Sequence, residues 1–187
     1  MSYPKTIIGL AGRARSGKTT VAQQLCVKGF HELAFADPIV DALTMIFDVP
    51  SEYRTFKKEH PLPGFNFSYR KAAQTLGTDW GRRMLDADLW IQVLANRIHM
   101  VADDSDCIVI SDVRFENEAQ WIRSQGGEVW HIVRPGFDGG VREHASENGI
   151  EILQGEKVLV NDKGIEELCA LVEKSLWDGV NWLWGLS

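Results

Sequence analysis

The sequence predicts an α/β domain in which a five-stranded parallel β-sheet is flanked by helices. Short apolar runs that suit buried strands alternate along the chain with helical patterns, as is typical of a parallel sheet covered on both faces. A glycine-rich stretch follows the first apolar run, and two polar excursions interrupt the alternation. These observations predict one domain with a central core and two insertions.

The composition limits the classes of protein that need to be considered. A chain of 187 residues is long enough for one well-buried core. Its net charge is −6 with no basic block, so we expect no direct nucleic-acid partner. No apolar run approaches the length of a membrane span, so neither secretion nor membrane insertion is expected. The three cysteines lack C-x-x-C spacing and are expected to be reduced core thiols of a cytosolic protein.

Each element of the core is predicted from its own pattern. Runs of apolar and β-branched residues predict strands at residues 6–11, 30–36, 107–111, 128–133 and 157–160. Helical spacing of apolar residues predicts helices at residues 17–28, 38–47, 90–98, 116–125 and 165–176. Asn161 or Asp162 is expected to cap the last of these helices.

Two polar excursions stand apart from this alternation. Residues 51–88 include K-K-E-H-P-L-P-G-F-N-F and a helix near 69–76, and we expect them to form an insertion on the core. Residues 135–150 are polar and glycine-rich, and we expect them to form a movable flap. The core would then comprise residues 1–50, 89–134 and 151–187. Phe65, Phe67 and Tyr69 are interpreted as the insertion's own small core rather than as a platform for a base.

The glycine-rich stretch carries the strongest functional signal. Residues 9–20 read G-L-A-G-R-A-R-S-G-K-T-T and fit the pattern G-x-x-x-x-G-K-[ST] at Gly12, Gly17, Lys18 and Thr19. In such a loop, backbone N–H groups hold phosphates, the lysine reaches the β- and γ-phosphates, and the hydroxyl binds Mg²⁺. An apolar strand before it and a helix after it predict a nucleoside triphosphate site on the P-loop NTPase fold.

An acidic residue at the end of the third strand completes the donor side. Asp112 follows C-I-V-I-S, where an acid commonly holds Mg²⁺ beside a P-loop. The alternative is that Asp112 caps the next helix. We favour the metal-side role, with Thr19 as the second protein ligand.

Arginines outside the phosphate loop suggest a second phosphate-bearing molecule. The planar guanidinium donates two hydrogen bonds to two phosphate oxygens at once. Arginines in predicted loops, insertions or strand ends are Arg54, Arg70, Arg82, Arg83, Arg114, Arg134 and Arg142. A surface arginine is often only a solvated charge, so the argument rests on the set.

Several stretches in order carry a resemblance to a known family. They are F-A-D-P-I (35–39), R-K-A-A-Q-T-L-G-T-D-W-G-R (70–82), D-L-W-I (88–91), I-S-D-V-R-F-E-N-E (110–118), I-V-R-P-G (132–136) and H-A-S-E (144–147). With the phosphate loop, they make the chain resemble the phage-type deoxynucleoside monophosphate kinases, relatives of adenylate kinase and dephospho-coenzyme A kinase. The combination of S-D-V-R-F-x-N-E with Q-T-L-G-T-D is its most specific part.

The resemblance implies a closing enzyme that uses ATP and Mg²⁺ to phosphorylate a deoxynucleoside 5′-monophosphate for DNA precursor synthesis. The acceptor would lie beneath the 51–88 insertion, and 135–150 would form the lid over ATP. Implied acceptor contacts are Asp37, Arg70, Gln74, Thr78, Asp79, Arg82 and Arg114. Implied ATP contacts are Gly12, Ala14, Arg15, Ser16, Gly17, Lys18, Thr19, Thr20 and Arg134, with Arg142, His144 and Glu147 in the lid. Lys18, Arg15, Arg82 and Arg114 would act on the transferring group.

Some residues keep a second interpretation. Asp37 precedes Pro38, so it is equally a candidate N-cap for the helix that follows. Glu147 could simply order the lid. The tail carries Trp177, Trp182 and Trp184, which would either form a homodimer contact or pack back on the core.

Two other functions remain open from the residues alone. In a dephospho-coenzyme A kinase the acceptor is a ribose hydroxyl, and Asp37 would be the candidate base. A GTPase-like switch or a non-catalytic nucleotide-binding module is the alternative of another class. The guanine-binding pattern N-K-x-D is absent from the sequence, and V-N-D-K-G at 160–164 only scrambles its letters. In the kinase interpretation this stretch would lie beside the donor adenine.

Overall fold

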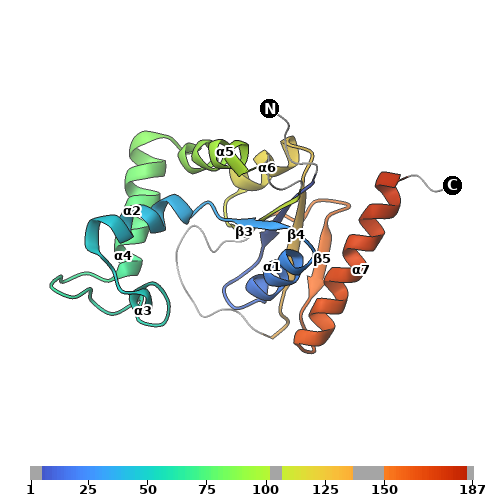
Figure 1. Ribbon diagram of the computed structural model, residues 1–187, viewed down its shortest axis with the longest axis horizontal. Helices are drawn as coiled ribbons and strands as arrows, with labels where there is room; N and C mark the ends of the chain where they lie inside the picture. Colours follow the sequence, from blue (N-terminus) through green and yellow to red (C-terminus); the bar gives the residue numbers. More distant parts are fainter. Residues whose placement is uncertain (1–5, 102–106, 137–149, 185–187) are drawn as a thin grey trace. The chain divides into compact units, whose positions relative to one another are not determined.

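The computed structural model describes residues 6–101, 107–136 and 150–184 (Figure 1). Its contacts divide the chain into two compact units. We call Phe35–Arg97 the helical unit, and the remainder, up to Ala34 and from Ile98 onward, the sheet unit. Within the described residues no helix is both long enough and apolar enough to cross a membrane.

The sheet unit contains the predicted five-stranded parallel sheet. The strands are β1 (Thr6–Ala11), β2 (His31–Leu33), β3 (Cys107–Val113), β4 (Glu128–Val133) and β5 (Lys157–Val160). They pair in parallel in the order β2-β3-β1-β4-β5. The expected strand at 30–36 is shorter, because only His31–Leu33 pairs with β3 before the chain turns into the helical unit.

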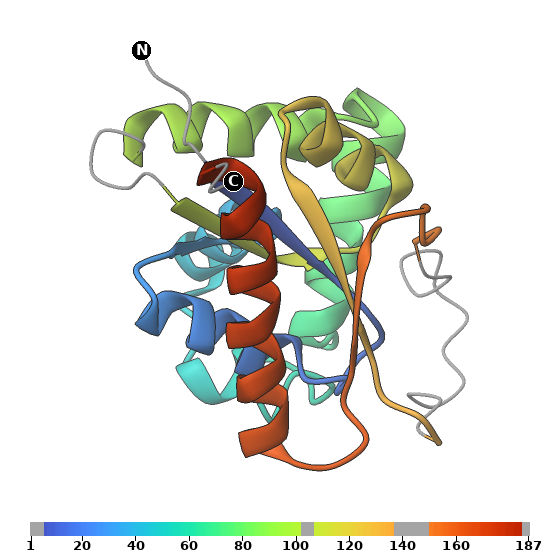
Figure 2. The same ribbon diagram turned by 90° about the vertical axis from the view of Figure 1, so that its right-hand side faces the viewer.

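Helices cover both faces of this sheet, as predicted. On one face α1 (Lys18–Val27) and α7 (Ile165–Trp184) bury Leu25, Leu168 and Val172 against the strands, around a fully buried Trp130. Figure 2 shows α7 running alongside the strands. On the other face α6 (Glu116–Ser124) approaches closely, because a Cβ at Gly9 would lie only 2.5 Å from Ile122 Cδ1. Each large side chain buried in this way stabilises the fold by about 1.5–3 kcal/mol.

The cysteines and Trp177 are more exposed than residues of the core. Cys26, Cys107 and Cys169 are thiols as predicted, but they are half-buried rather than fully in the core. Trp177 exposes 69% of its surface, so this ring does not pack back on the core. The side chains of Trp182 and Trp184 lie outside the described residues.

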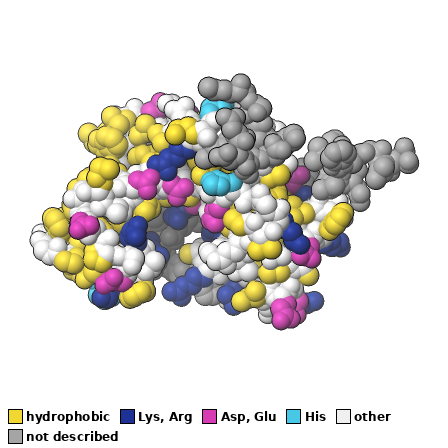
Figure 3. All heavy atoms as spheres, in the orientation of Figure 1, with side chains coloured by type: hydrophobic (Ala, Val, Ile, Leu, Met, Phe, Trp, Pro, Cys, Tyr) yellow, Lys and Arg dark blue, Asp and Glu magenta, His cyan; other side chains and the backbone are white. Residues whose placement is uncertain are grey.

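The helical unit has a small core of its own. It contains α2 (Asp37–Phe47), α3 (Ser51–Arg54), α4 (Tyr69–Gln74), η1 (Thr75–Leu85) and the start of α5 (Leu89–Val101). Leu43, Val49, Leu62 and Tyr69 are buried together, and Phe67 packs against them. The Phe65 ring lies 5.1 Å from those of Phe47 and Phe67, centroid to centroid. Phe67 and Tyr69 therefore belong to the predicted core of this segment, whereas Phe65, 43% exposed, lies at its edge. Other hydrophobic side chains reach the surface of the unit (Figure 3), with Met45 exposing 87% of its area.

The helix expected at 69–76 is longer than predicted and changes type. After α4 the chain continues to Leu85 as a π-helix, whose backbone pairs residue i with i+5. Two of its residues contact Trp90: a Cβ at Gly81 would lie 2.7 Å from the indole ring, and Trp90 Nε1 donates a 2.7 Å hydrogen bond to the Gly77 carbonyl. A tertiary contact therefore accompanies this wide turn, which apolar periodicity does not encode.

We predict that Gly81→Ala destabilises the protein by about 1–3 kcal/mol, because the added methyl group overlaps a buried ring. The measurement is urea unfolding followed by tryptophan fluorescence. Met84→Ala is the control, since Met84 is 74% exposed in the same helix and should cost no more than about 0.5 kcal/mol. Equal effects of the two substitutions would contradict the proposed ring contact.

A half-buried carboxylate, that of Glu156, links β4 and α6 to the segment before β5. Glu156 accepts hydrogen bonds from His131 Nε2 at 2.7 Å, Arg123 Nε at 2.8 Å and the Leu153 N–H at 2.9 Å. Burial alone would raise the pKa of Glu156, but these donors outweigh burial and lower it. The charged form of Glu156 is therefore a stabilising element of the sheet unit.

Glu156→Gln should lower the free energy of unfolding by about 2 kcal/mol at pH 7, because a charged hydrogen-bond network loses its acceptor. Since the pKa of Glu156 is lowered by folding, this contribution is present above the ordinary carboxyl value of about 4.3 and is lost as pH falls below it. Urea unfolding between pH 7 and pH 3 should show the gap to wild type narrowing at the acid end. Glu166→Gln, at an exposed site, is the control.

Candidate active site

The predicted donor-side residues gather at the carboxyl edge of the sheet. The phosphate loop follows β1, Arg114 follows β3, Arg134 follows β4 and Asn161 follows β5. β1 lies between β3 and β4, where the strand order reverses. Ligands of open parallel sheets bind at this edge and at this point of reversal. The topology therefore places segments far apart in sequence around one region of the sheet unit.

Both motif glycines are required by the shape of the phosphate loop. Gly12 has φ 148°, and a Cβ there would overlap the Ile132 carbonyl oxygen. Gly17 has φ 115°, and its Cβ would lie 2.7 Å from Asn161 Nδ2. Side chains rarely adopt such φ values and would also collide here. Arg15 takes φ 62° without being glycine, so the loop holds one further left-handed residue.

Lys18 lies at the centre of the charged groups of this loop. Its Nζ donates to the carbonyl oxygens of Gly12 at 2.6 Å and Arg13 at 2.9 Å. Burial and then the Arg114 guanidinium lower the pKa of the Lys18 ammonium, the Asp112 carboxylate opposes them, and the net pKa is about 8. Asp112 in β3 and Arg114 after it therefore both act on the pKa of Lys18. An anionic phosphate would favour its charged form.

Asp112 occupies an irregular part of β3. The pairing runs from Gly9 with Ile110 to Ala11 with Val113, so β3 contains one extra residue across Ser111 and Asp112. Such bulges turn side chains out of the regular pleat and are common beside active sites. Asp112 lies within β3, whereas α6 starts at Glu116 after Phe115. The alternative that Asp112 caps this helix is therefore wrong.

Glu118, the last residue of the S-D-V-R-F-E-N-E motif, has a structural role that the charge pattern alone does not indicate. Its side chain is buried, and one carboxylate oxygen accepts the N–H of Arg114 at 2.7 Å and that of Phe115 at 3.0 Å. These bonds fix the turn between β3 and α6. Glu118 therefore holds the backbone of Arg114, while the Arg114 side chain stays exposed.

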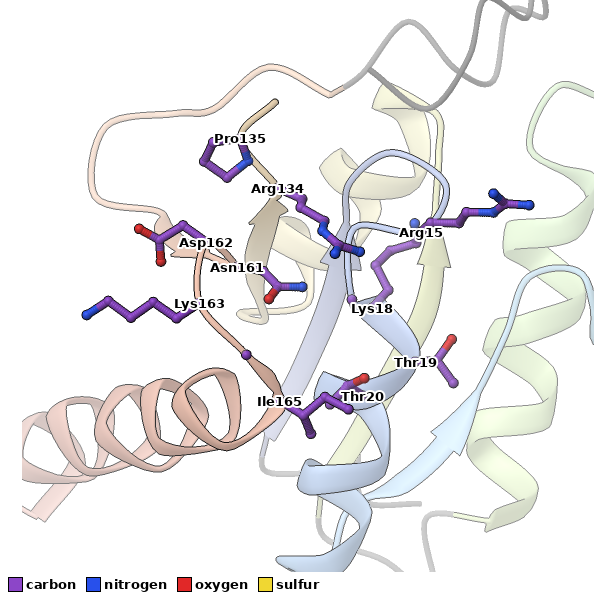
Figure 4. A pocket seen from close by; sticks show the side chains of 12 residues that line it. Arg15, Lys18, Thr19, Thr20, Arg134, Pro135, Asn161, Asp162, Lys163 and Ile165 are labelled. Carbon is purple, nitrogen blue, oxygen red and sulfur yellow. The ribbon is translucent and has the colours of Figure 1, made fainter. Parts of the chain in front are cut away.

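A pocket of about 730 Å³ lies beside the phosphate loop (Figure 4). Its lining is Arg15, Gly17, Lys18, Thr19, Thr20, Arg134, Pro135, Asn161, Asp162, Lys163, Gly164 and Ile165. Figure 4 shows Arg134 and Asn161, from two different loops, directed toward the phosphate-loop side of the pocket, where Lys18 begins α1, while the Arg15 and Lys163 side chains extend away on opposite sides. The structure thus brings together Arg15, Lys18, Thr19, Thr20 and Arg134 as the sequence predicted. Gly12 and Ser16 line a neighbouring cavity of about 680 Å³, and Ala14 is an exposed residue between them.

The interpretation of Asn161 and Asp162 as helix caps is wrong. α7 begins at Ile165, too far along the chain for either residue to flank it. Asn161 Nδ2 instead donates a 2.8 Å hydrogen bond to the Ser16 carbonyl of the phosphate loop. Sequence reasoning missed this contact, although V-N-D-K-G directly after an apolar strand marked the segment. The lid residues Arg142, His144 and Glu147 lie outside the described residues.

The predicted acceptor-side residues, apart from Arg114 in the sheet unit, belong to the helical unit. Arg70, Gln74, Thr78 and Arg82 recur every four residues along α4 and η1, and all four are half-buried. A spacing of four stays close to one face of a helix, since an α-turn takes about 3.6 residues and the i+5 bonds of a π-helix widen it. These side chains therefore form one polar stripe, which we call the arginine stripe.

Several of these side chains have partners within their unit. Arg70 pairs with Glu59, and Arg82 donates to the Ala87 carbonyl at 3.0 Å. Asp79 lies beside the stripe, and its carboxylate pairs with Arg83 at 2.9 Å.

Asp37 is the first residue of α2 rather than its N-cap, which is Ala36. The capping interpretation of Asp37 is thus wrong by one position. Its charge still lies in the first turn, where the helix dipole favours an acid.

The strand–loop–helix phosphate cradle on this parallel sheet defines the class of P-loop nucleotide-binding proteins. Residues 55–172 match the family described as deoxynucleotide monophosphate kinase. A protein of Acanthamoeba polyphaga mimivirus assigned to that activity is 38% identical over 181 residues, covering 86% of this chain and 91% of the relative. The chain belongs to the deoxynucleotide monophosphate kinase family.

Two further similarities extend this result. The deoxynucleotide monophosphate kinase of Escherichia phage RB69 is 34% identical over 111 residues, which cover 59% of this chain but only 45% of the phage enzyme. The chain thus matches about half the length of that curated relative. The APS kinase of Mycobacterium tuberculosis shares the fold, with a TM-score of 0.51 and 15% identity over 94% of this chain and 99% of that one.

Lys18→Ala should weaken binding of a nucleoside triphosphate by about 10- to 100-fold, because it removes a charged donor from the phosphate loop. Isothermal titration with ATP measures the change. Lys163→Ala is the matched control: this lysine lines the same pocket but extends away from Lys18, so we expect a loss of no more than about threefold. Comparable losses in both variants would show that only the net charge of the pocket matters.

Proposed function

We propose that this protein transfers the γ-phosphoryl group of ATP to a deoxynucleoside 5′-monophosphate, giving the diphosphate for DNA precursor synthesis. The observation that carries the proposal is the phosphate loop with Lys18, Asp112 and Arg114 in one electrostatic cluster, in a chain of this kinase family. P-loop kinases use this combination to hold a donor triphosphate. The family relatives named for deoxynucleotide monophosphates supply the choice of acceptor.

The donor would bind in the sheet unit. The backbone of Gly12–Thr20 would hold its phosphates, with Lys18 and Arg134 neutralising charge and Arg15 assisting the transferring group. The lid at 135–150, with Arg142, His144 and Glu147, is proposed to cover ATP. The segment from Asn161 to Ile165 also lines this pocket, which suits a base attached to the phosphates.

The residues also fit Mg²⁺. Thr19 offers an exposed hydroxyl at the start of α1, and Asp112 offers a carboxylate that Lys18 already senses. Oxygen ligands of these two kinds are those that Mg²⁺ prefers. When bound, the ion would neutralise phosphate charge.

The acceptor is proposed to bind on the helical unit, beneath the insertion at 51–88. Arg70 and Arg82 of the arginine stripe would hold its phosphate, and Gln74, Thr78, Asp79 and Asp37 would contact its sugar or base. Arg114 would bridge donor and acceptor phosphates. No general base is required, because the attacking group is already a phosphate oxyanion at neutral pH. The work of the protein is to position the two substrates and exclude water.

The direct test is ADP formation from ATP with each deoxynucleoside monophosphate, each ribonucleoside monophosphate and dephospho-coenzyme A. We expect turnover stimulated by at least one deoxynucleoside monophosphate. Stimulation by dephospho-coenzyme A alone would instead support the alternative in which Asp37 acts as a base. A folded protein that binds ATP but responds to no acceptor would overturn the kinase proposal.

Arg82→Ala should raise the KM for the deoxynucleoside monophosphate about 10- to 100-fold, because a bidentate contact to its phosphate is removed. The Kd for ATP should stay within about twofold of wild type. Arg83→Ala is the control, since this neighbouring arginine is exposed and paired with Asp79 instead of lying in the stripe. If the substitution at 82 weakens only ATP binding, the acceptor assignment is wrong.

A further inference from the structure

We propose that Asn161 is a positioning residue for the donor phosphates: its side chain holds the phosphate loop in its binding shape. The inference rests on the proposed function only in taking the donor to be a nucleoside triphosphate. The juxtaposition that carries it is between the loop after β5 and the peptide that joins Ser16 to Gly17.

Both the backbone and the side chain of Asn161 are held. Its N–H donates a 2.7 Å hydrogen bond to the Val133 carbonyl at the end of β4, which continues the pairing of β4 with β5. From this anchor Nδ2 donates to the Ser16 carbonyl at 2.8 Å. The residue is half-buried at the wall of the donor pocket, and Figure 4 shows its amide directed toward the phosphate-loop side.

This hydrogen bond determines where one N–H of the loop points. A trans peptide is planar, with its C=O and N–H directed to opposite sides, and no cis peptide occurs among the described residues. Because the Ser16 carbonyl points at Asn161, the N–H of Gly17 points away from it. Gly17 precedes the first residue of α1, so this N–H belongs to the orphan donors of a helix N-terminus, the groups that bind phosphate.

The local packing suits an asparagine. A Cβ at Gly17 would lie 2.7 Å from Nδ2, so the amide packs directly over the glycine. Ser16 is only 3% exposed, and its carbonyl would have little access to water if Nδ2 were removed. Aspartate would keep the shape but set a carboxylate against the carbonyl oxygen, while leucine would keep the volume and lose the donor.

A competing role for Asn161 is direct contact with the base of the donor, because the residue lines the same pocket. The two roles differ in their response to a ligand without a base. A residue that shapes the phosphate loop affects inorganic tripolyphosphate and ATP alike, whereas a base contact affects ATP alone.

The experiment is isothermal titration of wild type, Asn161→Ala, Asn161→Leu and Asn161→Asp with Mg²⁺–ATP and Mg²⁺–tripolyphosphate. We expect each variant to raise the Kd of both ligands by a similar factor of about tenfold, and Asn161→Asp to bind both ligands least tightly. Gln24→Ala is the matched control, since Gln24 Nε2 also makes a single long-range bond, to Glu173 between α1 and α7, outside the pocket. It should bind both ligands like wild type.

Two outcomes would overturn the proposal: weaker binding of ATP with unchanged binding of tripolyphosphate, or unchanged binding of both ligands. If the melting temperature of Asn161→Ala falls well below that of Gln24→Ala, the comparison of the two ligands is made with the volume-conserving Asn161→Leu instead. Failure of the proposed function is separate, because it would appear as absent acceptor-stimulated turnover in a wild type that still binds both ligands.

Discussion

The approach of the phosphate loop to the end of β4 is the constraint on which the site depends. A side chain at Gly12 would overlap the Ile132 carbonyl, so the loop reaches this place only with glycine there. β4 also pairs with β1 and β5, leads into Arg134, and accepts the Asn161 N–H at Val133. β4 thus positions the phosphate loop, Arg134 and Asn161 relative to one another.

The electrostatics are local. The chain carries a net charge of −6, yet Arg15, Lys18 and Arg134 share one pocket. The bulge in β3 places Asp112 where it acts on the pKa of Lys18, and Glu118 fixes the backbone of Arg114. An acidic protein can therefore present a positive site to a polyanion while its remaining surface repels larger polyanions.

The strands, their parallel pairing and the phosphate loop were predictable, because apolar runs and glycine positions report burial and backbone shape directly, whereas the strand order was not predicted. The acidic residue beside the phosphate loop was predicted from the motif and the strand end, and the Asp112 carboxylate does act on the pKa of Lys18, while its metal-side role remains a prediction. Asn161 was misassigned, because its partner Ser16 lies far away in sequence and only the sheet order brings the two together. The π-helix was missed for a similar reason: the Gly77 carbonyl and the backbone at Gly81 contact Trp90, and apolar periodicity does not indicate these contacts. The acceptor and lid assignments remain predictions.

The π-helix has a consequence for how this segment tolerates changes in length. Trp90 contacts two positions one wide turn apart: its Nε1 donates to the Gly77 carbonyl, and its ring leaves room only for glycine at position 81. Deleting one residue between them would favour ordinary α-helical pairing, but it would bring a side chain under the indole and rotate every residue beyond it, Arg82 included. The segment can therefore exchange side chains on its outer face, yet its residue count is fixed by a single tryptophan.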